Sequence, residues 1–484
     1  MTASRIRIAG ASVFCLLIAG CTVGPNYKRP TAPAPPAFKE LAPPPGIPNG
    51  TWKQAQPSDQ VLRGNWWEIY NDPQLNALEE KVAISNQTLK AATEQYFTAR
   101  AAIQVYRANY FPTLTAGLSV ARQHQSENRP TAVPGAISQY NDFALAGQAS
   151  WEPDLWGQVR RSVESARATA QASAADLANV ELSIRSELAQ DYFELRGLDL
   201  QKQLLDNTAA SYADYLNLTQ ARFKGGVATE SDVDLAETQL KSTQAQAIDV
   251  GVARAQFEHA IATLTGEPAS SFSLAQAPLS LPLPQVPPGL PSELLERRPD
   301  IAGMERRADA ANAQIGVAIA AYYPNITLTG TGGFESRNPG AWIQGPSALW
   351  SLGASASELL FDAGRRHAVT EEARDNYQVT VANYRQSVLN AFQEVEDNLA
   401  ALRILNQEAT TQADAVAAAQ RSLQVSTTRY KEGLVDYLEV LTAQTALLTN
   451  QRTQADITTR QFAANVLLIK ALGGGWDTSQ LPKL

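Results

Sequence analysis

The charged residues best placed to act together lie at two glycine turns that repeat each other. Arg222-Phe223-Lys224-Gly225-Gly226-Val227 returns 207 residues later as Arg429-Tyr430-Lys431-Glu432-Gly433-Leu434. A basic last turn followed by glycine is what the end of a helix requires. Acids follow each turn within a few residues, namely Glu230, Asp232 and Asp234 after the first and Asp436 and Glu439 after the second.

These acids allow two interpretations. Thr229 with Asp232, and Asp436 with Glu439, have the three-residue spacing of a capping box, in which side chains satisfy the free amides of a helix start. The same carboxylates could instead gate a passage, by repelling one another or by attracting cations. The sequence leaves capping and gating open for Asp232, Asp234, Asp436 and Glu439.

The sequence offers no convincing catalytic or metal-binding constellation. Its three histidines, His124, His259 and His367, lie in separate segments, which argues against a zinc site. The glycine-rich stretch at 330–333 alternates like a strand and no helix follows it, so it does not predict a phosphate-binding loop. We therefore expect neither enzyme activity nor a cofactor.

Residues 1–20 have the pattern of a lipoprotein signal peptide. Arg5 and Arg7 precede an apolar run at 8–19 that is too short to cross a bilayer as a stable helix. Small residues before Cys21 resemble a lipoprotein processing box, which implies that Cys21 becomes the first mature residue and carries lipid. An ordinary signal peptide with an incidental cysteine is the alternative. Thr22, where an aspartate would indicate inner-membrane retention, favours the outer membrane.

Charge and cysteine content restrict the mature chain further. Loss of Arg5 and Arg7, with no acid, takes the net charge from −8 to −10, which disfavours a nucleic-acid partner. Cys15 leaves with the signal and Cys21 would be acylated, so no disulfide is expected despite export. The mature sequence has no apolar run of about 18 residues, and we expect no membrane-spanning α-helix.

Repetition organises the rest of the chain. Besides the two turns, Tyr110-Phe111-Pro112 returns as Tyr322-Tyr323-Pro324, which indicates one structural unit used twice. Proline-rich stretches predict extended segments between the units. The expected divisions are a lipidated N-terminus with an extended tether at 21–60, a first repeat at 61–267, a linker at 268–298, a second repeat at 299–475 and a tail at 476–484.

Each repeat is expected to contain a helix, two short strands, a very long helix and a returning helix. The first helix is expected over about 73–109, and proline-free long helices over about 158–224 and 365–431, each on the order of 100 Å. In the second long helix, Val381, Val388 and Val395 recur every seven residues, as in a coiled-coil seam. The first long helix carries two such lines on different flanks: Val163, Ala170, Leu177 and Ile184, and Ala168, Ala175, Leu182 and Ala189. Two seams favour a wall of helices over the alternative, a two-stranded coiled coil.

Four shorter segments, at about 113–123, 141–152, 325–336 and 348–360, alternate apolar with small polar residues. Their period and length suit strands that cross a bilayer, and aromatic residues near their ends suit its interfaces. Four strands cannot close a spanning barrel, and an open edge in lipid leaves backbone groups unpaired. We therefore expect the chain to share a barrel with other copies, of which three would supply twelve strands. A soluble sheet with one dry face is the alternative.

Several separate motifs resemble one known family. They are Cys21-Thr22-Val23-Gly24-Pro25-Asn26-Tyr27, Trp66-Trp67-Glu68, Leu295-Glu296-Arg297-Arg298-Pro299-Asp300-Ile301, the stretch Ala310 to Ala318, and Tyr323-Pro324-Asn325-Ile326. Together they resemble the TolC-type outer-membrane factors, in particular the lipoprotein branch that serves multidrug efflux pumps. The resemblance covers essentially the whole mature chain.

The resemblance implies a mainly α fold with a β membrane part. It implies a homotrimer in which a twelve-stranded β-barrel in the outer membrane continues as a twelve-helix α-barrel across the periplasm. Such a protein is the passive exit duct of a three-part exporter, in which an inner-membrane pump delivers small molecules through a periplasmic adaptor.

The resemblance also implies that the two glycine turns form the periplasmic tip, where the tunnel narrows. Asp436 matches an acidic gate position and Glu439 a tip acid of the family, whereas Thr442 stands where the branch has another acid. Arg222 and Arg429 are candidate partners for these acids. The candidate adaptor contacts are Gly225, Gly226, Val227, Gly433, Leu434 and Val435.

Two other functions stay open on the sequence. The same architecture serves as the exit duct of type I polypeptide secretion, although the lipid box and the 297–300 region favour drug efflux. A lipid-tethered coiled-coil scaffold that transports nothing is a more distant alternative, against which the four strand patterns argue.

Overall fold

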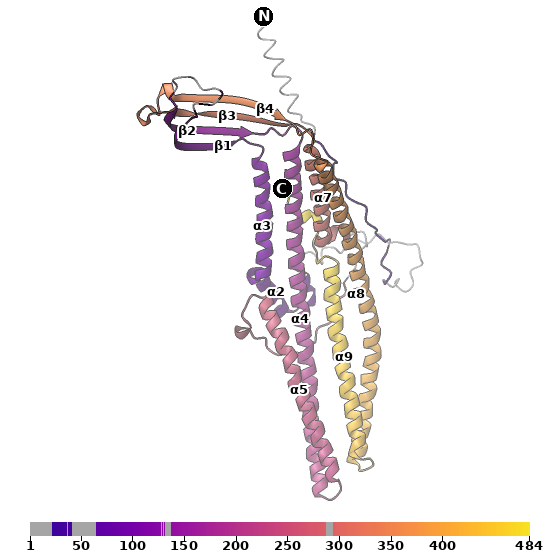
Figure 1. Ribbon diagram of the computed structural model, residues 1–484. Helices are drawn as coiled ribbons and strands as arrows, with labels where there is room; N and C mark the ends of the chain where they lie inside the picture. Colours follow the sequence, from indigo (N-terminus) through magenta and orange to yellow (C-terminus); the bar gives the residue numbers. More distant parts are fainter. Residues whose placement is uncertain are drawn as a thin grey trace.

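The computed structural model describes residues 22–35, 37–40, 64–126, 128, 130, 137–286 and 294–484. Long helices run side by side, and a four-stranded sheet projects sideways from one end of them (Figure 1). Two helical hairpins form the opposite end. The signal peptide and Cys21 lie outside the described residues.

The same order of elements occurs twice, with matching lengths. The first set is α3 (Gln87–Ala108), β1 (Thr113–His124), β2 (Gln139–Trp151), α4 (Gln158–Lys224) and α5 (Glu230–Leu264). The second set is α7 (Pro299–Ala320), β3 (Asn325–Ser336), β4 (Ala348–Ser357), α8 (Arg365–Lys431) and α9 (Tyr437–Ala471). Corresponding helices have the same number of residues, namely 22 in α3 and α7, 67 in α4 and α8, and 35 in α5 and α9. Strand β4 ends three residues before the boundary expected from the sequence.

The single first helix expected over 73–109 is wrong, because the chain breaks at Asn86. Helix α2 (Pro73–Ser85) ends there and α3 begins. Asn86 is extended, with ψ of 121°, and its side chain accepts a hydrogen bond from the amide of Leu89, which caps α3. Its Nδ2 donates to the carbonyl of Leu264 at 2.8 Å, so the break is held against the end of α5.

The seams of α4 contact more than one neighbour. Val163 and Ala170 of the first seam pack with Ile103 of α3. Further along, Ile184 of that seam joins Leu182 and Ala189 of the second in a core cluster with Phe462 and other residues of α9. Helix α4 contacts α3 and α5 as well as α7 and α9. The pattern of a helix inside a wall is therefore present within one chain. None of the helices among the described residues is both long and apolar enough to cross a membrane.

A belt crosses the helices midway along their length. It contains η2 (Trp66–Tyr70), α2 and the segment that follows α5. Buried Asp199 of α4 binds this segment: its Oδ2 accepts from the amide of Ala277 at 3.0 Å and its Oδ1 from Arg254 at 2.7 Å. Paired in this way, the buried charges stay hydrogen-bonded and hold the described part of the linker against the body.

The described part of the N-terminal segment is docked on the helices, a contact that its prolines did not predict. Residues 22–35 and 37–40 lie along the helices, and we call them the N-terminal strap. Arg161 of α4 donates to the carbonyls of Val23 and Gly24, each at 3.1 Å. Further along, the buried Phe38 packs among residues of α8, and the amides of Lys39 and Glu40 donate to Glu396. Proline favours an extended backbone, and an extended backbone can bind to the helices when its carbonyls and amides find hydrogen-bond partners there.

Close packing of α4 on α9 yields the first prediction. At Gly197 an added Cβ would overlap the side chain of Thr459, a branched residue with little freedom to move. We expect Gly197→Ala to destabilise the helical body by about 1–3 kcal/mol, as overpacked cores do. Guanidinium unfolding followed by circular dichroism measures the change. Gly251→Ala on α5, where an added Cβ meets nothing, is the matched control and should be neutral or slightly stabilising. Equal midpoints for the two variants would contradict the packing account.

Candidate functional site

The sheet has one apolar and one polar face. Its four antiparallel strands follow the order β1-β2-β3-β4. One transverse row joins Leu114, Ala149, Gly330 and Leu352, and the next joins Thr115, Gln148, Thr331 and Ser351. The alternation continues along the strands, with Leu118, Leu145 and Phe334 on the apolar side. Side chains of one kind thus share one face, as in a sheet between lipid and water.

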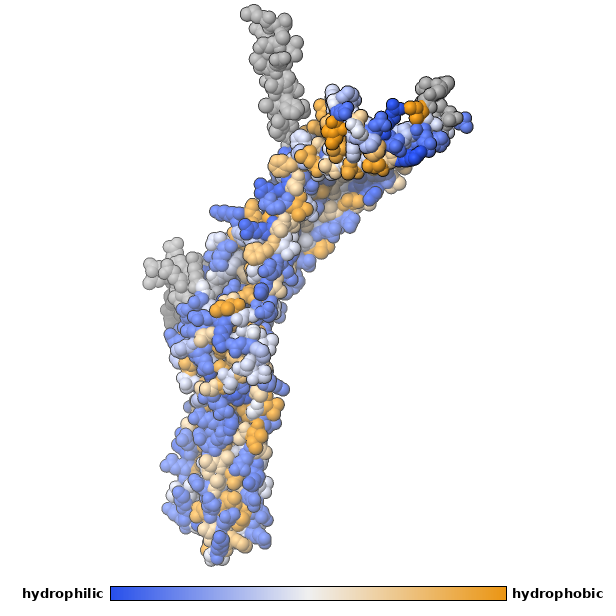
Figure 2. Space-filling view, turned by 90° about the vertical axis from the view of Figure 1, so that its left-hand side faces the viewer, coloured by the Kyte–Doolittle hydropathy of each residue, from blue (hydrophilic) through white to orange (hydrophobic). Residues whose placement is uncertain are grey.

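Within the described residues, much of this face and both sheet edges are uncovered. Leu114 is 79% exposed and Leu352 is 81% exposed. Figure 2 shows apolar residues on the part of the sheet near the helices and hydrophilic residues at its far end. Within the described residues, β1 pairs only with β2 and β4 only with β3, so two full edges lack a neighbour. An exposed apolar face with open edges requires another surface to complete it.

Aromatic residues mark the junction between sheet and helices. Trp151 at the end of β2 donates its Nε1 hydrogen to the carbonyl of Tyr110 at 3.0 Å. Trp156 stacks on Tyr323 with 4.9 Å between ring centroids and donates to the carbonyl of Pro324 at 2.8 Å. Each ring has an apolar body and a satisfied polar atom, which suits a membrane interface.

At the far end, the first hairpin tip is held by a complete capping box. The amide of Asp232 donates to Oγ1 of Thr229 at 3.2 Å, and Oδ2 of Asp232 accepts from the amide of Thr229 at 2.8 Å. Gly226 has φ of 74°, the left-handed conformation that lets the chain turn back. Asp232 therefore works as a cap within this chain, while Asp234 is exposed on the first turns of α5.

The second tip divides the two roles between its acids. Asp436 caps α9 by accepting from the amide of Glu439 at 3.3 Å. The side chain of Glu439 does not complete a capping box; its Oε1 lies 2.9 Å from Nη1 of Arg429 and accepts from Ser426 at 3.1 Å. Gly433, with φ of 78°, makes the turn. Arg429 is thus brought to a tip acid, as the sequence suggested.

Arg222 is placed differently from its expected role. Instead of an acid it contacts Tyr430 of the other hairpin, donating to its carbonyl at 3.0 Å with the guanidinium 4.3 Å from the ring centroid. A second bridge between the hairpins joins the hydroxyls of Tyr215 and Thr427 at 2.9 Å. Tyr437 packs its ring near Tyr215 and Tyr430, at 6.1 and 5.9 Å. We call Arg222, Tyr215, Tyr430 and Tyr437 the tip latch.

Sequence reasoning named one member of the tip latch and missed its tyrosines. Burial raises the pKa of the Tyr437 phenol, whose oxygen has no hydrogen-bond partner among the described residues. The repeat itself held a signal for Tyr430, because it stands where the first turn has Phe223. Four large apolar residues are exposed beside the tip latch: Phe223, Val227, Leu434 and Leu438.

A stripe of acids on α4 was also missed. Glu187, Asp191 and Glu194 share one side of the helix. Burial, and then the charges of the two neighbouring carboxylates, raise the pKa of Asp191 to about 7. Arg185 faces the belt, because it donates to the carbonyl of Glu79 in α2. Glu194 lies nine residues, or two and a half turns, further along and therefore on the opposite side of α4. The acids therefore lie on the face of the helices that the belt does not cover.

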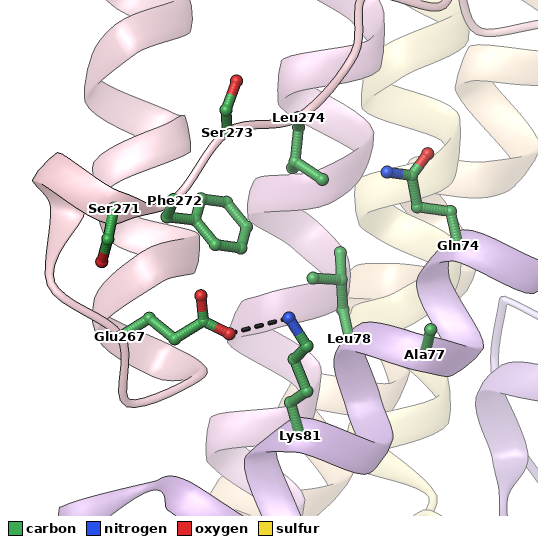
Figure 3. A pocket seen from close by; sticks show the side chains of 9 residues that line it. All are labelled: Gln74, Ala77, Leu78, Lys81, Glu267, Ser271, Phe272, Ser273 and Leu274. Atoms are coloured by element: carbon green, nitrogen blue, oxygen red, sulfur yellow. Dashed lines mark hydrogen bonds and ion pairs between the residues drawn. The ribbon is translucent and has the colours of Figure 1, made fainter.

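A cleft at the level of the belt has no catalytic arrangement. It lies between α2 and the chain after α5, where Lys81 reaches across to Glu267 at 2.7 Å beside Phe272 (Figure 3). The other residues that line it are Gln74, Ala77, Leu78, Ser271, Ser273 and Leu274. No group of three or more metal-ligating side chains occurs in the part of the chain that was described. The features that remain are surfaces: an amphipathic sheet and a charged, latched tip.

The chain was compared with known protein families and structures. The family model for outer membrane efflux proteins matches residues 78–267 and 290–474, which are the two repeats. The chain belongs to the outer membrane efflux protein family. The family expected from the sequence motifs is therefore confirmed, and it is a family of channels.

Relatives match over nearly their whole length. The chain is 31% identical to the toluene efflux pump outer membrane protein TtgC of Pseudomonas putida, over 98% of this chain and 96% of that protein. Its fold superimposes on the outer-membrane channel OprN with a TM-score of 0.84 at 30% identity, over 94% of this chain and 100% of that one. It is also similar to the open state of the MtrE outer membrane channel of Neisseria gonorrhoeae, with a TM-score of 0.81 at 26% identity, over 94% and 98% of the two chains. The fold class expected from the sequence is confirmed.

The different contacts of the two tip acids give the second prediction. Asp436 needs only an acceptor to cap α9, so we expect Asp436→Asn to leave the tip unchanged. Asp436→Ala removes the cap, weakens the start of α9 by about 1 kcal/mol and should raise conductance through the tip. Single-channel recording in a planar bilayer measures both. An equal rise in the two variants would show that the charge of Asp436, not its cap, keeps the tip closed.

Glu439 gives the third prediction, in which the charge of the side chain matters rather than its ability to cap a helix. Glu439→Gln keeps an oxygen for Ser426 but removes the charge that holds Arg429. An exposed ion pair contributes only about 0.2–1 kcal/mol, so folding should not change while the closed tip loosens. The same recording tests this, with Glu432→Gln on the adjacent turn as the control. Unchanged conductance in Glu439→Gln would exclude the ion pair as a restraint.

Proposed function

We propose that three copies of this chain form the outer-membrane exit duct of a tripartite efflux system. The observation that carries the proposal is the amphipathic four-stranded sheet with two open edges and an exposed apolar face. In lipid, every backbone donor and acceptor needs a partner, so the edges of this sheet demand closure. Pairing β4 of one copy with β1 of the next would close a ring of twelve strands after three copies.

The helices fit the same arrangement. Each chain contributes two helical hairpins beneath its four strands, and three chains would continue the barrel as a helical wall. The belt would lie outside this wall, so the stripe of Glu187, Asp191 and Glu194 would face the tunnel. A lumen lined with carboxylates favours cations and neutral solutes over anions.

The tip would be the gate of the duct. Threefold symmetry would bring three copies of Glu439, each held by Arg429, around the axis, with Asp436 and Asp234 nearby. The tip latch ties the two hairpins of one copy together, so opening would require the hairpins to separate at Arg222 and Tyr430. We infer that the exposed Val227, Leu434 and Leu438, with the turn glycines and Val435, meet the periplasmic adaptor.

The duct would supply neither energy nor chemistry. Its relatives' names include toluene efflux, which supports small drugs or toxic compounds as the transported class. An inner-membrane pump would deliver them through the adaptor, with no cofactor and no enzyme activity in this chain. We further infer that Cys21 is acylated and adds a lipid anchor in the outer membrane to the inserted barrel.

The two faces of β4 give the fourth prediction, which tests the proposal. Leu352→Arg puts a charge into lipid at a cost of about 2–4 kcal/mol per copy, whereas Ser351→Arg points to the lumen one residue away. We expect Leu352→Arg to abolish assembled protein in the outer-membrane fraction and Ser351→Arg to assemble and reduce conductance. Heat-modifiable migration on gels, then bilayer recording, measures the two effects.

Two results would sink this proposal. If both variants assemble equally, the apolar face does not contact lipid. If neither the assembled wild-type protein nor its Glu439→Gln variant passes current, the protein is a scaffold rather than a duct.

A further inference from the structure

Arginines gather on the two helices directly below the sheet, although the chain as a whole is acidic, with net charge −8. Arg100 and Arg107 lie seven residues apart on α3, and Arg160 and Arg167 lie seven residues apart on α4. Seven residues are about two turns, so each pair forms a column about 10 Å long on one side of its helix. We call these four residues the arginine patch.

The two columns lie together. Helices α3 and α4 pack through Ile103, Val163 and Ala166, with Tyr110 at the edge of the same cluster. The phenol of Tyr110 lies within electrostatic range of the guanidinium groups of Arg160, Arg167 and Arg107. Three positive charges, with Asp154 as the one acid among them, thus lie near one point at the upper end of this helix pair.

The acids nearest the arginine patch on α4 are bound to other partners or to one member: Glu164 pairs with the buried Arg161 at 2.8 Å. Asp154 is bound to Arg160 at 3.1 Å. Arg100, Arg107 and Arg167 are exposed, and no carboxylate of the described residues lies within ion-pair distance of them. Helix α3 has a single acid, Glu94, at its other half. The favourable end of a helix dipole accounts for Arg107 in the last turn of α3, but not for Arg167 inside α4.

The position of the arginine patch selects its ligand. Arg107 lies six residues before β1, and Tyr110 accepts the indole hydrogen of Trp151 at the end of β2. If the sheet spans the outer membrane as proposed, this level is the headgroup region of the periplasmic leaflet. The layer is roughly 5–7 Å deep. Arg107 and Arg160 lie in the helix turns next to it, and Arg100 and Arg167 lie about 10 Å further down on the same columns.

We propose that the arginine patch binds the phosphate groups of anionic phospholipids in the periplasmic leaflet. The inference rests on the proposed membrane orientation, but not on transport. Guanidinium groups bind phosphate through paired, charge-assisted hydrogen bonds, and basic residues at a bilayer surface attract anionic lipid. Tyr110 and Trp151 complete the site as interfacial aromatics. The second repeat has no charged residue in the last three turns of α7, so one such site occurs per copy.

Native mass spectrometry of the assembled full-length protein, titrated with phosphatidylglycerol or phosphatidylcholine, tests the proposal. We expect the wild type to retain phosphatidylglycerol preferentially. An arginine near a charged membrane surface contributes roughly fivefold, so Arg107→Gln with Arg167→Gln should weaken retention about 25-fold. The Arg107→Lys, Arg167→Lys pair keeps the charge and should retain most of the preference. Arg421→Gln, an exposed arginine far down α8, is the matched control and should change nothing.

Each contrary result overturns the proposal in a distinct way. Equal retention of both lipids by the wild type shows that the arginine patch has no preference for anionic lipid. Displacement of phosphatidylglycerol by millimolar inorganic phosphate indicates a site for free phosphate. Loss of the assembled form in the double glutamine variant, but not in the lysine pair, assigns the patch to a neighbouring copy. Conductance recorded on the same samples tests the proposed duct separately from the lipid site. A protein that fails to conduct can still prefer phosphatidylglycerol, and a conducting protein can lack that preference.

Discussion

The backbone hydrogen bonds at the two free edges of the sheet are the constraint on which the rest of the structure depends. A four-stranded sheet has too little curvature to close on itself, so its edge strands keep unpaired backbone groups. Its exposed apolar face is also unfavourable in water. In the proposed trimer both needs would be met by the same event, association with further copies, which would pair the edges and leave the apolar face to lipid. The helices follow from this, because each strand pair continues into a long helix, and a closed ring of strands therefore organises a closed ring of helices.

The duplicated hairpins show how one unit can acquire two roles. Both tips turn at a glycine and begin the returning helix with a capping side chain, so their backbones are alike. The first tip directs its acid, Asp232, back onto its own cap and is locally complete. In the second, Glu439 is released from capping and held by Arg429 instead. Tyr430 and Arg222 then connect the two tips, so the repeats differ at the place where movement between them would matter.

Much of the fold could be predicted from the sequence because its signals are local. Period two marks the strands, period seven marks both seams of α4, and proline-free runs between glycines mark the long helices. The break at Asn86 was missed because its cap depends on Leu264, a residue far away in sequence. Arg222 was given the wrong kind of partner for the same reason: charge suggested an acid, whereas the fold brings a tyrosine carbonyl and ring from the other repeat. The tip residues themselves were found, since the turns repeat.

The N-terminal strap has a consequence for the order of events in biogenesis. Tyr27 bonds to Glu305, 278 residues away, and the amide of Lys39 bonds to Glu396, 357 residues away. Val23 and Gly24 can reach Arg161 as soon as α4 has been made. The partners of Tyr27 and Lys39 lie on α7 and α8, so this part of the strap is among the last to reach its native position. Contacts so distant in sequence also slow folding. Docking of the N-terminal strap therefore depends on synthesis of the second repeat.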